Sequence, residues 1–242
     1  MNPIRVLIGV LACMLLVWFG MIYMPGRTSG PRIPKEDMSW KDRDREFSLE
    51  AVRARALKNP DSFEAQVALG KLYLRRGESS EAVTALQTAL RLKPTDGDCL
   101  LHPGKALHNQ GRTEEALNAF EQAGRNDSSL GEAFSRAAVI YYRRRDLDNA
   151  IPLFRQAIRA NPSDATSHNN LASALASRGD YDQAIAEYEA VLQSEPKNGS
   201  VMNLIAACHR AKGDTRVATD WYRRACDAGY HSACSAARRP VN

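Results

Sequence analysis

The stretch FEAQVALGKLYLRRGESSEAVTALQTALRLKPTD, residues 63–96, decides the fold because its pattern returns four more times along the chain. Ala82 is followed by an alanine every 34 residues, at positions 116, 150, 184 and 218. A large side chain recurs with the same spacing at positions 86, 120, 154, 188 and 222. Self-similarity at a fixed period of this length is the signature of a repeat protein.

Each unit has the pattern of two helices, and the unit 165–198 shows it most clearly. Apolar residues at three- and four-residue steps define one face at positions 171, 172 and 175 and a second at 184, 185, 188 and 191. Gly179 interrupts the pattern between the two segments, and Glu195-Pro196 ends it, since the residue before proline disfavours helix. We therefore predict five stacked helix hairpins, 63–96, 97–130, 131–164, 165–198 and 199–232, in an all-α, right-handed superhelical solenoid with a concave inner face.

These residues resemble tetratricopeptide repeats over about 170 of the 242 residues. Residues 63–96 are similar to the family consensus at Leu69, Gly70, Tyr73, Gly77, Ala82, Leu86, Ala89 and Pro94. Other copies depart from it in places. Pro103 lies inside the first helix of the second repeat, where we expect a kink, Arg145 replaces the turn glycine of the third, and the last copy has no terminal proline. The resemblance implies a protein that binds other proteins and has no catalytic role.

Segments outside the repeats have their own patterns. Residues 45–62 predict a capping helix with Phe47, Leu49, Val52 and Ala56 as its apolar face, and residues 233–242 predict a C-terminal tail. Residues 25–44, rich in proline, glycine and charge, predict a linker.

Residues 6–24 form an apolar run without a charged side chain, so residues 1–24 predict a single transmembrane helix, with membrane contact through 6–24. A cleaved signal peptide and a lipoprotein lipidated at Cys13 are the alternatives. Positive charges after the run, such as Arg27, favour a cytoplasmic location for the repeats.

The last portion of the array, WYRRACDAGYHSAC (residues 221–234), resembles a Sel1-like repeat. That resemblance implies a disulfide between Cys226 and Cys234, with Gly229 at the chain reversal. Two reduced thiols, or a zinc site that adds His231, are the alternatives. Because disulfides form in oxidising compartments, the pair opposes the charge count and favours a periplasmic domain on the inner (cytoplasmic) membrane.

The chain shows no pattern typical of an enzyme. It contains no nucleophile with a base, phosphate-binding loop or paired metal ligands, so we expect no catalytic residues, cofactor or metal. The net charge is +5, but no basic block is interleaved with aromatic residues, and we expect no nucleic-acid partner.

The family resemblance implies a peptide-binding groove along the first helices of the repeats. Its ligand-facing positions fall here on Lys71, Arg75, Lys105, His108, Ser135, Arg143, Asn169, Ser173, Asn203 and Arg210. The asparagines can hydrogen-bond the backbone of an extended segment, and the basic residues favour an acidic one.

The leading hypothesis is a membrane-tethered scaffold that recruits a peptide or subunit during assembly of an envelope or membrane complex. The alternatives are a lipoprotein assembly factor for a pilus or secretion pore and an accessory subunit of a membrane enzyme complex.

Overall fold

The computed structural model describes residues 40–238, and the predicted anchor (1–24) lies outside them. Within the described residues the protein is an all-helical repeat solenoid of twelve α-helices without strands. None of these helices combines the length and the apolar character that crossing a membrane requires. The predicted handedness of the superhelix stays a prediction.

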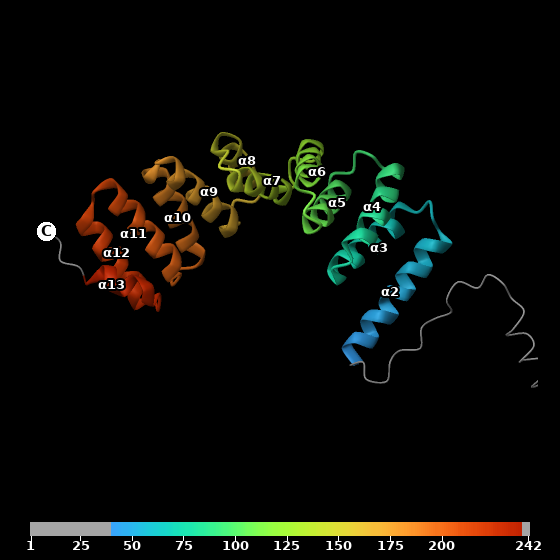
Figure 1. Ribbon diagram of the computed structural model, residues 1–242, viewed down its shortest axis with the longest axis horizontal. Coiled ribbons are helices and arrows are strands. Elements are labelled where there is room, and N and C mark those ends of the chain that lie inside the picture. Colours follow the sequence, from blue (N-terminus) through green and yellow to red (C-terminus); the bar gives the residue numbers. More distant parts are fainter. Residues whose placement is uncertain (1–39, 239–242) are drawn as a thin grey trace, which may run out of the picture. The chain divides into compact units, whose positions relative to one another are not determined.

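The five predicted repeats each contain one helix hairpin, and the paired helices pack on each other and on the next hairpin (Figure 1). The elements are α2 (Trp40–Lys58), α3 (Phe63–Arg76), α4 (Ser79–Leu92), α5 (Gly97–Asn109), α6 (Thr113–Asn126), α7 (Gly131–Arg143), α8 (Leu147–Ala160), α9 (Ala165–Arg178), α10 (Tyr181–Ser194), α11 (Gly199–Lys212), α12 (Thr215–Asp227), the 3₁₀ turn η1 (His231–Ala233) and α13 (Cys234–Ala237).

The chain divides into two units between Ser48 and Leu49. Of the first unit the structure describes residues 40–48, which begin α2. This helix starts five residues before the predicted capping helix, so part of the predicted linker is helical. In the second unit Leu49 and Ala56 are buried in the same apolar cluster as residues of α3 and α4, as expected of a cap.

Local sequence explains where the first helices begin and end. Ser62 and Asp96 accept hydrogen bonds from the backbone N–H groups of Ala65 and Cys99 and so cap α3 and α5. Gly77 ends α3 at φ 79°, a left-handed conformation that glycine adopts without a steric cost. α5 runs as one helix through Pro103, the site of the expected kink.

The core depends on a small residue in each first helix facing a large one in the second. A Cβ added at Gly104 would lie 2.6 Å from the Phe120 ring, and one at Gly70 would lie 2.4 Å from Leu86. Leu86 and Phe120 are in turn almost fully buried. The small residue lets the two backbones approach, and the large one fills the space between hairpins.

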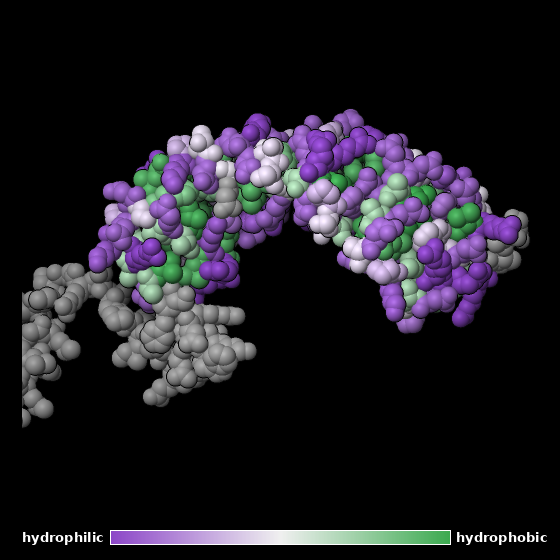
Figure 2. Space-filling model, turned by 180° about the vertical axis from the view of Figure 1, so that it is seen from behind, coloured by the Kyte–Doolittle hydropathy of each residue, from purple (hydrophilic) through white to green (hydrophobic). Residues whose placement is uncertain are grey.

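The first residues of the tail predicted from residue 233 are helical, in η1 and α13. Ala233 is buried, and η1 and α13 pack on α12. Hydrophilic side chains dominate the face of the molecule shown in Figure 2, and hydrophobic ones gather in separate patches.

Arg145 yields the first prediction. It has φ 61° at the turn where glycines stand in the other four repeats, and a side chain in this conformation costs about 1 kcal/mol. Arg145→Gly should raise the free energy of unfolding by about 1 kcal/mol, measured by urea denaturation. Arg145→Ala is the control, because it removes the side chain and keeps the strain. Equal stability of the two variants would contradict the assignment of strain.

Candidate functional site

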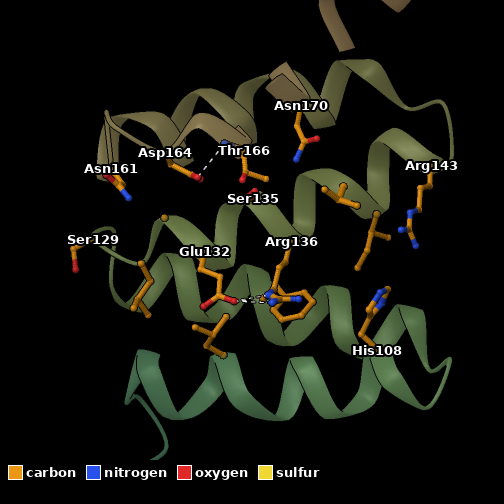
Figure 3. A pocket seen from close by; sticks show the side chains of 16 residues that line it. His108, Ser129, Glu132, Ser135, Arg136, Arg143, Asn161, Asp164, Thr166 and Asn170 are labelled. Carbon is orange, nitrogen blue, oxygen red and sulfur yellow. Dashed lines mark hydrogen bonds and ion pairs between the residues drawn. The ribbon is translucent and has the colours of Figure 1, made fainter. Parts of the chain in front are cut away.

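A hollow of about 740 Å³ lies along α5, α7 and the start of α9 (Figure 3). Three of the ten predicted groove residues line it: His108, Ser135 and Arg143. Its apolar lining comes from Leu101, Phe120, Leu130, Val139 and Ile140. The hollow, called the central hollow below, therefore combines an apolar surface with polar side chains from three successive repeats.

An ion-pair network joins the second and third repeats beside this hollow. Lys105 Nζ lies 2.8 Å from Glu132 Oε2, and Arg136 Nη2 lies 2.7 Å from Glu132 Oε1. Burial opposes ionisation of Glu132, but the hydrogen bonds from Lys105 and Arg136 outweigh it and lower the pKa of this carboxyl. Lys105, predicted to bind a partner, is thus already paired within the chain.

His108 and Arg143 lie at one end of the central hollow (Figure 3). The Nδ1 atom of His108 is buried and has no hydrogen-bond partner among the described residues. Arg143 is exposed, and no ion pair to it occurs within residues 40–238. A buried polar atom without a partner costs free energy, so a ligand that hydrogen-bonds His108 and carries a negative charge for Arg143 fits this end.

At the other end of the hollow the α8–α9 connection supplies Asn161 and Asp164. The Asp164 carboxylate accepts hydrogen bonds from Thr166 N–H at 3.2 Å and Ser167 Oγ at 2.5 Å, which caps α9. Asn170 projects from α9 into the hollow (Figure 3). Its amide offers both a donor and an acceptor to a peptide backbone.

The other predicted residues lie outside the central hollow. Asn169 lines a smaller hollow of about 260 Å³ beside α11. The Ser173 hydroxyl donates to Asn169 O at 2.9 Å and lies 3.0 Å from the Tyr188 hydroxyl, so it is engaged in the core.

The candidates in the first and last repeats likewise do not line the hollow. Lys71 is half-buried and Arg75 exposed on α3. On α11, Asn203 is half-buried, and the guanidinium of Arg210 lies 5.7 Å from the centre of the Tyr222 ring.

Sequence reasoning missed Glu132, Arg136 and Asn170. The first two stand four residues apart with opposite charge, a helical ion-pair spacing that was readable in the sequence. Asn170 adjoins the predicted Asn169, and one residue rotates the side chain by about 100° around the helix. Only the packing of α9 on α7 decides which of the two asparagines faces the hollow.

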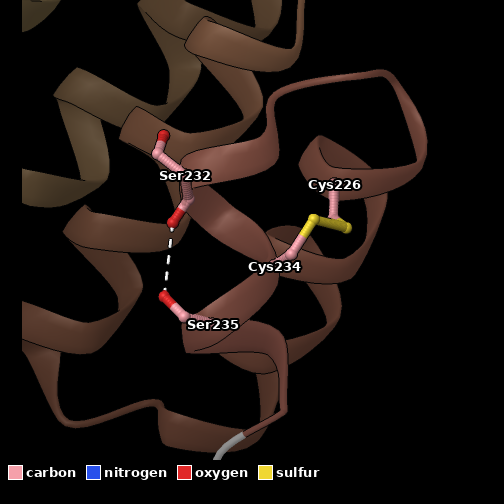
Figure 4. The surroundings of a disulfide bond; sticks show 4 residues. All are labelled: Cys226, Ser232, Cys234 and Ser235. Atoms are coloured by element: carbon pink, nitrogen blue, oxygen red, sulfur yellow. Dashed lines mark hydrogen bonds between the residues drawn. A yellow bond between two sulfur atoms is a disulfide. The ribbon is translucent and has the colours of Figure 1, made fainter.

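The structure joins Cys226 of α12 to Cys234 of α13 by a disulfide, with their Cα atoms 4.9 Å apart (Figure 4). The chain reverses between them at Gly229, which has φ 90°. With both sulfurs in this bond, neither offers the thiolate that a zinc site with His231 requires. Among the described residues no cluster of three or more histidine, cysteine or acidic side chains is placed to hold a metal ion.

A family model for the tetratricopeptide repeat matches residues 45–97, 103–165, 135–193 and 169–233. The chain belongs to the tetratricopeptide repeat family. The resemblance of residues 221–234 to a Sel1-like repeat has no support in these matches. A search of curated protein sequences finds no match.

Solved structures of other tetratricopeptide repeat proteins share the fold. YrrB, described as a tetratricopeptide repeat protein with an unusual peptide-binding site, is 19% identical with a TM-score of 0.67, over 74% of this chain and 93% of its own. MamA is 20% identical with a TM-score of 0.64, and the match covers 74% of this chain and 97% of MamA. The C-terminal part of a tetratricopeptide repeat protein from Cytophaga hutchinsonii is 17% identical with a TM-score of 0.67. The match covers 79% of this chain and 77% of the other.

Tyr188 yields a pH prediction. Burial raises the pKa of this phenol to about 12, against about 10 in an unfolded chain. Because the folded state holds the proton more tightly, stability is intact below pH 10 and falls by about 2 to 3 kcal/mol as the pH rises from about 10 to 12. Tyr188→Phe should remove this part of the alkaline slope, measured by denaturant unfolding across that range. An unchanged slope would contradict the prediction.

The disulfide yields a third prediction. Closing the short loop between Cys226 and Cys234 stabilises η1 and α13 on α12 by about 2 to 3 kcal/mol in the loop-entropy model. Reduction should therefore lower the hydrogen-exchange protection of residues 230–237 more than that of α7. The double variant Cys226→Ser/Cys234→Ser should show the lowered protection without reductant and no further response to it. A reductant response in that variant would show that the effect arises elsewhere.

Proposed function

We propose that this protein is a non-catalytic, membrane-tethered scaffold whose central hollow binds an extended segment of a partner protein during assembly of an envelope or membrane complex. The observation that carries the proposal is the end of the hollow with His108 and Arg143. There a buried nitrogen without a partner and a cation without an ion pair, among the described residues, border an apolar surface.

The chemistry of the hollow favours a particular kind of segment. Leu101, Val139 and Ile140 offer a surface for apolar side chains. Arg143 offers a planar donor to a carboxylate, from an acidic side chain or a C-terminus. Asn170 and Ser135 offer hydrogen bonds to the peptide backbone. An apolar segment that contains or ends with an acidic group meets all of these features.

Two further observations support the proposed setting. The apolar run 6–24 has the length of a membrane anchor, and an anchor would raise the local concentration of the scaffold near membrane partners. The Cys226–Cys234 disulfide favours an oxidising compartment, and hence a periplasmic domain on the inner membrane. The peptide-binding site named for YrrB is consistent with a peptide ligand.

The experiment selects random nine-residue peptides against the full chain and measures the affinity of the selected peptides by fluorescence anisotropy. We expect apolar peptides with an acidic residue. Arg143→Gln should weaken them about tenfold, because one charge-assisted hydrogen bond is lost.

The matched control is Arg145→Gln. It removes the same charge two residues away, at an exposed position outside the hollow, and should leave the affinity unchanged. Equal weakening by the two variants, or selected peptides that bind Arg143→Gln as tightly as the wild type, would overturn the proposal.

A further inference from the structure

Three arginines stand at the same position of the first three repeats. Arg91, Arg125 and Arg159, called the arginine row below, are 34 residues apart and lie in the last turns of α4, α6 and α8. In the fourth and fifth repeats the same position holds Gln193 and Asp227, so the row ends after the third. All three arginines lie on second helices, whereas His108 and Arg143 belong to first helices.

The charges of the row are largely uncompensated. All three side chains are exposed. Arg125 has a loose ion pair, with 3.6 Å between its Nη1 and Glu121 Oε2, and the other oxygen of that carboxylate accepts a hydrogen bond from the Tyr141 hydroxyl. Arg91 donates to the neutral Thr88 hydroxyl, and within residues 40–238 neither Arg91 nor Arg159 forms an ion pair.

Hollows without carboxylates border the row. Arg125 and Arg159 both line a hollow of about 630 Å³ between α6 and α8, where Ser128, Ser129 and Gln156 add neutral hydrogen-bonding groups. Arg91 lines another, of about 610 Å³, with Gln87 and Thr88. No acidic side chain lines either hollow.

The helix dipole explains why arginine is tolerated at these positions, since a cation near a helix C-terminus is favourable. It does not explain the hollows that adjoin the guanidinium groups. These hollows favour a polypeptide, because neutral polar and apolar side chains line them beside the arginines and offer contacts to several kinds of side chain.

We propose that the arginine row is a second binding surface, which takes an extended acidic segment of a partner protein. Of the residues that line the central hollow, it shares only Ser129. Alternate side chains of an extended segment point to the same side. Every second side chain of the segment therefore faces the row, and carboxylates among these side chains can meet the guanidinium groups and enter the hollows beside them. Arginine and carboxylate form paired hydrogen bonds of matched geometry.

The test uses a fluorescein-labelled peptide of six Glu-Ser pairs, with the Gln-Ser peptide as its neutral counterpart. Binding to the full chain is measured by anisotropy at about 20 mM salt, where exposed charges are weakly screened. We expect the acidic peptide alone to bind, and the triple variant Arg91→Gln/Arg125→Gln/Arg159→Gln to weaken it about tenfold.

The matched control is Arg112→Gln/Arg216→Gln/Arg223→Gln, which removes three exposed charges elsewhere and should bind as the wild type does. Arg143→Gln, which tests the central hollow, should also leave binding of the acidic peptide unchanged. A failure of the proposal for the central hollow can therefore be told from a failure of the proposal for the arginine row. Circular dichroism checks that each variant is folded.

Two results would overturn the inference. One is that the triple variant of the row and the matched control weaken binding of the acidic peptide equally, which would show a general effect of net charge. The other combines two observations. The acidic peptide does not bind the wild type, and the triple variant Arg91→Gln/Arg125→Gln/Arg159→Gln alone no longer co-sediments with vesicles of phosphatidylcholine and phosphatidylglycerol. That result would assign the row to anionic lipid.

Discussion

The contact between a small residue on each first helix and a large residue on each second helix is the constraint on which the rest of the structure depends. Gly104 and Phe120 show it most directly, because the ring occupies the space that a Cβ at position 104 would need. Ala172 and Tyr188, both buried, occupy the same positions two repeats later. This contact fixes how closely the two helices of a hairpin approach, and so where the outward side chains lie.

The candidate binding surfaces follow from the stacking of repeats. The central hollow takes side chains from the second, third and fourth repeats, and the Lys105–Glu132 ion pair ties two of these repeats together beside it. Exposed ion pairs contribute little to stability, so its main effect is to hold Glu132 and Arg136 in place. The arginine row is produced by the same 34-residue period on the second helices.

The two ends of the array are closed in different ways. At the N-terminal end of the second unit, Leu49 and Ala56 of α2 cover apolar residues of the first repeat. At the C-terminal end, α13 packs on α12 and a disulfide holds it there. A repeat array needs such caps because its terminal repeats otherwise expose the face that a neighbour would bury.

The sequence by itself determined the repeats, their hairpins and their turns, because a 34-residue period and helical apolar spacing are local patterns. The resemblance of residues 221–234 to a Sel1-like repeat implied the Cys226–Cys234 disulfide but left reduced thiols and a zinc site open, and the structure shows the disulfide. Only the tertiary structure decided which polar residues share a surface. Asn170 faces the central hollow in place of Asn169. Ser173 turns into the core toward Tyr188. Lys105 forms an ion pair with Glu132. These outcomes depend on how one repeat rotates and packs against the next, and side chains far apart in sequence carry no local signal of that packing.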